Sequence, residues 1–219
     1  MIKVGSESWR FEKSIDELPH VALYVRDALR LEIDNEETDP PRLAGDIADR
    51  SDWLDETTRR DAAREWPAWW DAIIGPVAEA PSLPEGGSAS GRQRASRHMQ
   101  YLDPPFWDSL TDHPALRQAL TAAFDEASRF AEDLRRRVIT ESPRPSPDFP
   151  YEVIRRAAEA VAAAAGVSLG VLDASASVIY VEGSWWRVPR RGELLSSIGA
   201  ARDPDQAYRA LTAVFMSVV

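Results

Sequence analysis

Apolar residues recur at helical spacing in five stretches of the chain. Residues three and four positions apart lie on one side of a helix, so each stretch presents an apolar stripe to a core. The spacing predicts helices over residues 14–33, 51–80, 114–138, 150–165 and 204–218. Ser14 with Glu17 forms a capping box at the first helix, and Asp203 followed by Pro204 caps the last. Pro67 marks a kink or the start of a second helix within 51–80.

A different pattern runs from Gly166 to Ala201, and the rest of the fold is expected to pack against this region. Apolar and polar residues alternate from Val167 to Val171, which is typical of a strand. Gly183-Ser184 suits the type II′ turn of a hairpin. A last strand is expected over residues 194–200. The region therefore predicts an antiparallel meander of three or four strands.

The predicted turn decides which side chains share a face of the hairpin, because directly opposed residues point to the same side of a sheet. One face is apolar and belongs to the core; it carries Ile179, Val181, Trp186 and Val188. The other face carries Tyr180, Glu182, Trp185 and Arg187. Trp186 is thus predicted in the core, and Trp185 is predicted to be at least partly accessible.

Together these elements predict an α+β fold: a helical N-terminal portion, and a small antiparallel three- to four-stranded meander flanked by helices at the C-terminus. Residues 81–112 read as a long loop or linker, because their first half is rich in Gly, Ser and Arg. We expect residues 81–96 to be the most mobile internal stretch. The predicted portions are 1–80, the linker 81–112 and 113–219, or a single domain over 1–219.

Charge narrows the classes of partner. The 219 residues include 36 acidic and 26 basic side chains, which gives a formal net charge of −10. Nucleic acids and anionic membranes are bound through basic patches, so both are disfavoured as partners. The balance suits a soluble protein and favours a basic partner. No apolar run approaches the roughly 20 residues needed to span a bilayer.

Several residue types that carry chemistry are missing or scattered. Cysteine is absent, which excludes disulfides, thiolate metal sites and a cysteine nucleophile. The N-terminal segment lacks the apolar region of a signal peptide, so the cytoplasm is the expected location. His20, His98 and His113 show no metal-ligand spacing. We therefore predict no catalytic residues, no metal site and no cofactor.

Two motifs match a functional pattern only in part. Gly166 to Gly170 has the G-x-S-x-G spacing of a hydrolase nucleophile, but that serine needs a strand before it and a helix after it. The predicted order here is the reverse, and no histidine follows His113. Four aspartates recur every third residue and could hold a hard cation: Asp46, Asp49, Asp52 and Asp55. Three-residue steps drift around a helix, so a solvated acidic surface, with some residues capping, explains them better.

Tryptophan and arginine supply the candidate binding residues, because both are enriched at the energetic centres of protein interfaces. The first predicted protein-binding patch consists of Trp185, Arg187, Arg190 and Arg191, unless a helix of the same chain covers Trp185. The second is Trp69 or Trp70. With Trp66 they place three tryptophans in five residues, which cannot share one helical face. At least one should lie at an edge, an interface or a ligand site, or else cover another helix.

These observations favour a non-enzymatic intracellular protein that binds another protein, for example an inhibitor or immunity-type protein for a basic partner. Two alternatives stay open: an enzyme with a site assembled from scattered Asp, Glu, Arg and Trp residues, and a structural subunit of a larger assembly. A deep pocket lined by convergent ionisable groups would favour the enzyme. A flat exposed aromatic patch would favour the binding protein.

Overall fold

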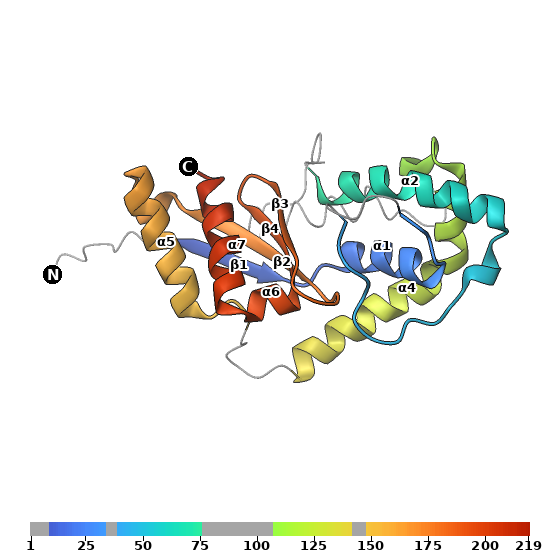
Figure 1. The fold of residues 1–219 in the computed structure, drawn as a ribbon, viewed down its shortest axis with the longest axis horizontal. Coiled ribbons are helices and arrows are strands. Elements are labelled where there is room, and N and C mark those ends of the chain that lie inside the picture. Colours follow the sequence, from blue (N-terminus) through green and yellow to red (C-terminus); the bar gives the residue numbers. More distant parts are fainter. Residues whose placement is uncertain (1–8, 34–38, 76–106, 142–147) are drawn as a thin grey trace, which may run out of the picture. The chain divides into compact units, whose positions relative to one another are not determined.

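The computed structural model describes residues 9–33, 39–75, 107–141 and 148–219. The chain divides into two compact units (Figure 1): a sheet unit of residues 1–15 and 142–219, and a helical unit of residues 16–141. These borders differ from the division suggested by the sequence at residues 81–112. Most of that predicted linker, including the stretch 81–96, lies outside the described residues.

The sheet unit holds a four-stranded sheet with the order β1-β2-β4-β3. Its strands are β1 (Arg10–Ser14), β2 (Asp173–Ile179), β3 (Trp186–Arg190) and β4 (Glu193–Ser197). β1 and β2 are parallel, as are β2 and β4, while β3 and β4 form an antiparallel hairpin. The α+β class is confirmed, with C-terminal strands flanked by helices.

The pairing of the strands differs from the predicted meander. β4 lies between β2 and β3, so the hairpin predicted at Gly183-Ser184 is wrong. The hairpin turns instead at Gly192, whose φ is +72°. A Cβ at this position would lie 3.2 Å from the carbonyl oxygen of Asp173, so glycine also leaves room for β2. Alternation predicts the two faces of a strand, but it does not identify the neighbouring strand.

Three local assignments also change. The predicted strand at Val167–Val171 contains a 3-10 turn instead, because the chain leaves the preceding helix through left-handed Gly166 and turns before it enters β2. Ser14 does not open a helix: it ends β1, and its hydroxyl donates to the Ala176 carbonyl at 3.4 Å. β1 itself was not predicted, because RFEKS has three charged residues and resembles a solvated segment.

Two helices cover one face of the sheet. α5 (Tyr151–Ala165) and α7 (Pro204–Met216) lie side by side over it, and the short α6 (Ile198–Arg202) precedes α7 (Figure 1). The contact is rich in alanine from both helices and from β2, which lets the layers approach closely. Asp203 caps α7 as predicted, accepting from the N–H groups of Asp205 and Gln206 at 2.9 Å.

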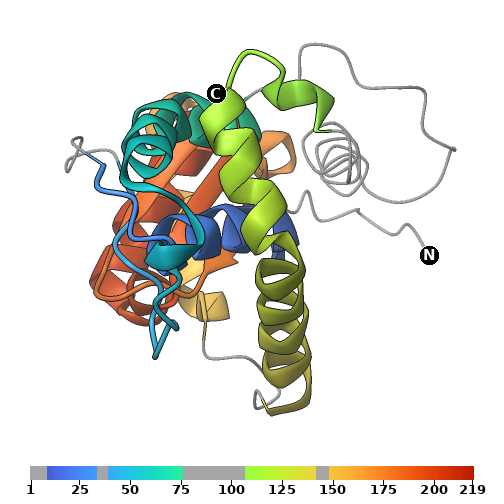
Figure 2. The same cartoon turned by 90° about the vertical axis from the view of Figure 1, so that its right-hand side faces the viewer.

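In the helical unit, α1 (Glu17–Ala28), α2 (Glu56–Ile74) and α4 (Pro114–Glu141) pack against one another (Figure 2). Short 3-10 turns lie at Ser51–Trp53 and Asp108–Leu110, ahead of α2 and α4. α2 continues through Pro67, so no second helix begins there. Among the described residues, no helix has both the length and the apolar character needed to cross a membrane.

Trp66 connects α2 to α1 in the core of the helical unit. Its side chain is fully buried, and its indole N–H donates to the Ala22 carbonyl at 3.1 Å. Its ring stacks on Trp70 with 5.3 Å between the ring centroids. The guanidinium of Arg26 lies 5.4 Å from the centroid of the Trp66 ring. One side chain thus combines packing, a hydrogen bond and a cation–π contact.

We expect Trp66→Ala to lower the free energy of unfolding by about 3–5 kcal/mol, because it leaves a large cavity and removes the cation–π contact with Arg26. The measurement is urea denaturation. The matched control is Trp53→Ala, since Trp53 is 42% exposed in the same unit; it should cost about 1 kcal/mol or less. Equal losses in the two variants would contradict the role assigned to Trp66.

His20 should make the stability of the fold depend on pH. Burial lowers its pKa below the usual 6.5, although the hydrogen bond from Nδ1 to the Asp16 carbonyl, 2.7 Å long, opposes the shift. The unfolded chain then binds the proton more readily, so the free energy of unfolding should fall as the pH drops below about 6.5. His20→Asn should flatten this dependence between about pH 5 and 6.5. Unfolding curves measured across that range test it, and an unchanged slope would contradict it.

Candidate functional site

Trp69 and Trp70 do not form a surface. Their side chains are 2% and 1% exposed, and Trp66 is fully buried as well. The prediction that Trp69 or Trp70 provides a binding patch is wrong, because α2 is covered on more than one side. The alternative weighed from the sequence, that these rings cover neighbouring elements, describes them correctly.

In β3, Arg187 pairs with Leu195 of β4 and lies on the same face of the sheet as that residue, while Trp185 directly precedes the strand. Trp186 and Val188 occupy the opposite face and pack against the core beneath α5 and α7. In the register of the hairpin, Trp186 pairs with Ser196 and Arg187 with its neighbour in β4. Trp185 is half-buried, and so is Trp186, which is less enclosed than predicted.

The other arginines of this predicted patch make contacts within the chain. Arg190 pairs with Glu193, and Arg191 donates to the carbonyl of Val218. Trp185 is fixed through its backbone, whose N–H donates to Ser197 Oγ at 2.9 Å and whose carbonyl accepts from the Ser197 N–H at 2.7 Å. Trp185 and Arg187 therefore remain a prediction as binding residues.

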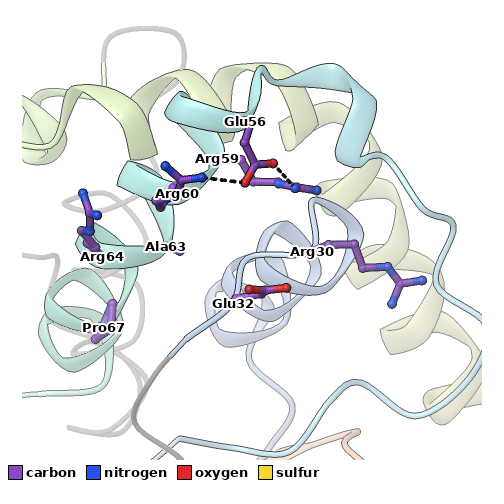
Figure 3. Close-up of a pocket in the computed structure, with 8 residues that line it drawn as sticks. All are labelled: Arg30, Glu32, Glu56, Arg59, Arg60, Ala63, Arg64 and Pro67. Atoms are coloured by element: carbon purple, nitrogen blue, oxygen red, sulfur yellow. Dashed lines mark hydrogen bonds and ion pairs between the residues drawn. The ribbon is translucent and has the colours of Figure 1, made fainter.

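A pocket that was not predicted lies in the helical unit. It has a volume of about 610 Å³ and is shown in Figure 3. Four arginines and two glutamates dominate its lining, with two small apolar residues: Arg30, Arg59, Arg60, Arg64, Glu32, Glu56, Ala63 and Pro67. We call it the arginine pocket. It concentrates cations on a chain whose net charge is −10.

The first turns of α2 build one wall of the arginine pocket. Asp55 caps the helix by accepting from the N–H groups of Thr57 and Thr58 at 3.0 and 2.9 Å. The helix thereby starts at Glu56, whose side chain reaches residues three and four positions later. Its carboxylate pairs with both Arg59 and Arg60, the latter at 3.1 Å. We call this three-residue arrangement the Glu56 clamp (Figure 3).

The other wall follows the end of α1. Arg30 has a left-handed backbone with φ +52°. The Leu31 N–H donates to the Arg26 carbonyl at 2.9 Å, and the Arg30 N–H to the Asp27 carbonyl at 3.4 Å. These are the two hydrogen bonds of a Schellman motif, which usually has glycine in the left-handed position. The motif fixes the direction of the chain on its way to Glu32.

Charges around the pocket are balanced in number. Arg30 pairs with Asp49 at 3.2 Å, and Arg64 pairs with Asp61 at 2.7 Å. With these two aspartates, four carboxylates accompany the four guanidiniums. Guanidinium groups stay protonated in proteins, so they bind and orient anionic groups and do not exchange protons near neutral pH. The described residues contain no group of three or more His, Asp or Glu side chains placed to hold a metal ion.

No known protein family, curated protein or solved structure matches this chain. Its function is therefore inferred from the geometry of the site.

One part of the pocket had a signal in the sequence. Glu56 precedes Arg59 and Arg60 at the spacing of helical ion pairs. That spacing is also typical of a solvated helix surface, so it did not identify a pocket. The contribution of Arg30 and Glu32 depends on tertiary packing and had no local signal. The aspartate series is correctly explained in part, since Asp55 is a cap.

Asp49 should titrate at unusually low pH. Its pKa is lowered from 3.8 to about 2, because Ser51 donates to the carboxylate through its backbone N–H at 2.9 Å and through its side chain, and Arg30 lies beside it. Since the folded pKa is depressed, this contribution to stability is present above about pH 3.8 and is lost as the pH falls toward 2. NMR titration of the carboxyl carbon should give a midpoint near 2. Arg30→Gln should raise it only slightly, because Ser51 causes most of the shift; a wild-type midpoint near 3.8 would contradict the geometry.

Proposed function

We propose that this protein is a non-enzymatic binding protein of the cytoplasm, and that it engages a protein partner through the arginine pocket. The observation that carries the proposal is the Glu56 clamp, in which one carboxylate orients two guanidiniums beside a cavity. Each guanidinium has five N–H donors in a fixed plane, so donors remain after the pair with Glu56 is formed. A carboxylate of the partner can bind to these donors.

The exposure of the lining supports a macromolecular partner. The side chains of Arg60 and Arg64 are 58% and 69% exposed, so the pocket is open to solvent at its rim. A site for a small molecule usually encloses most of the ligand's surface. An open depression lined by arginine suits a side chain that projects from a larger surface, where arginine often dominates the binding energy.

An enzyme is the rival class, and the chemistry of the lining disfavours it. General acid–base catalysis needs a group that gives and takes protons near the working pH. In this pocket the cations are guanidiniums and the Glu56 carboxylate is engaged by two of them, which leaves Glu32 as the single carboxylate of the lining without such a pair among the described residues. Turnover of a small molecule by the purified protein, lost in Arg60→Gln, would overturn the proposed class.

The arginine pocket and the net charge of the chain favour different groups on the partner. The net charge of −10 favours a partner that is basic overall, as expected if this protein is an inhibitor or immunity-type protein. The pocket itself takes an acidic group. We therefore propose a partner that presents a local acidic side chain to Arg59 and Arg60 without being strongly acidic over its whole surface.

The test begins with a protein that co-purifies with the native chain, whose affinity is then measured by calorimetry. Arg60→Gln should weaken binding by at least about tenfold, because a hydrogen bond between charged groups contributes about 1.5–3 kcal/mol.

The matched control is Arg136→Gln on α4. Arg136 pairs with carboxylates three and four residues earlier, Asp133 at 3.2 Å and Glu132 at 3.4 Å, but it does not line the pocket. The control should bind like the wild type. Equal affinity of the folded Arg60→Gln variant and the wild type would exclude the pocket as the binding site.

A further inference from the structure

We infer that the docking segment of the partner carries a basic side chain as well as an acidic one, and that the basic group binds to Glu32. This inference rests on the proposed function of the arginine pocket and deepens it by naming the chemistry of the ligand. It follows from the separation of opposite charges within the pocket.

Glu32 is the carboxylate of the lining that has no cationic partner among the described residues. It makes no ion pair or hydrogen bond with any other described residue, whereas Glu56 is held by Arg59 and Arg60. Figure 3 shows Glu32 on the wall opposite the Glu56 clamp, with open space between them. The clamp has an excess of one positive charge, and Glu32 supplies one negative charge across the cavity.

This separation selects for a ligand with two charges. A purely anionic group bound at the clamp would also face the carboxylate of Glu32 across the cavity, and like charges repel. A ligand that places its ammonium or guanidinium at Glu32 turns that repulsion into attraction. Complementary charges of this kind contribute to specificity, because the wrong charge on either side is rejected.

Two further features suit such a segment. The Schellman motif around Arg30 fixes the chain just ahead of Glu32, so the backbone of this residue has a defined position at the end of α1. Ala63 and Pro67 add an apolar part to the lining. The aliphatic stems of lysine or arginine and glutamate can pack there while their charged ends reach the two walls.

The test uses small probes in which the distance between the two charges varies. The zwitterions run from glycine to 6-aminohexanoate, and each is compared with the carboxylate of the same chain length that lacks the amine. Binding to the full chain is followed through the Nε–Hε NMR signals of the arginines, assigned with Arg59→Gln and Arg60→Gln. At least one zwitterion should bind three times or more tightly than its matched carboxylate. Glu32→Gln should remove this advantage, while carboxylate binding should persist or become tighter because the repulsion from Glu32 is gone.

The outcomes separate the two levels of the proposal. If carboxylates and zwitterions bind equally in the wild type, or if the preference survives in Glu32→Gln, the inference about Glu32 is wrong while the pocket stays a binding site. If no probe shifts the arginine signals, the pocket itself fails. A preference confined to glycine would point to a free amino acid and overturn the protein segment as the source. A preference for the longer members supports it.

Discussion

The buried ion pair between Arg26 and Asp27 is the interaction on which the helical unit depends. The two side chains are about 6% exposed, and the guanidinium contacts both oxygens of the carboxylate, at 2.8 and 3.2 Å. Arg26 also donates to the carbonyls of Pro40 and Pro41 at 2.6 and 2.8 Å, and Asp27 accepts from the Leu43 N–H at 2.7 Å. Removing one member of such a pair leaves a buried charge, which costs about 3–5 kcal/mol.

This network explains why the arginine pocket has a defined shape. It holds the chain around residues 40–43 against α1, and from there the chain continues to Asp49 and the cap of α2. The backbone N–H of Arg50 donates to the Ala28 carbonyl at 2.7 Å, which holds the same segment at the end of α1. The two walls of the pocket are thus connected by charges and carbonyls that sit in the interior of the unit.

The sequence predicted which segments form helices and strands better than it predicted which of these elements lie next to one another. Helical periodicity and the Asp203 cap were sufficient for α5 and α7, because both signals are local. The position of β4 between β2 and β3 depends on the parallel pairing of β2 with β4, and the alternation of side chains along a strand does not indicate which strand lies beside it. The same limit applies to the site. Glu56 and Arg60 are near in sequence, but Glu32 joins them only after α1 and α2 have packed.

β1 has a consequence for the synthesis of the chain. It ends at Ser14, yet the strand that pairs with it begins at Asp173, and the whole helical unit is encoded between them. A ribosome that adds about 5–20 residues per second needs roughly ten to thirty seconds to bridge that interval. During this time the first strand of the sheet has no partner, and α1, α2 and α4 are all synthesised before β2 is reached. The order of translation therefore favours a helical unit that forms first and a sheet that closes only when the last third of the protein emerges.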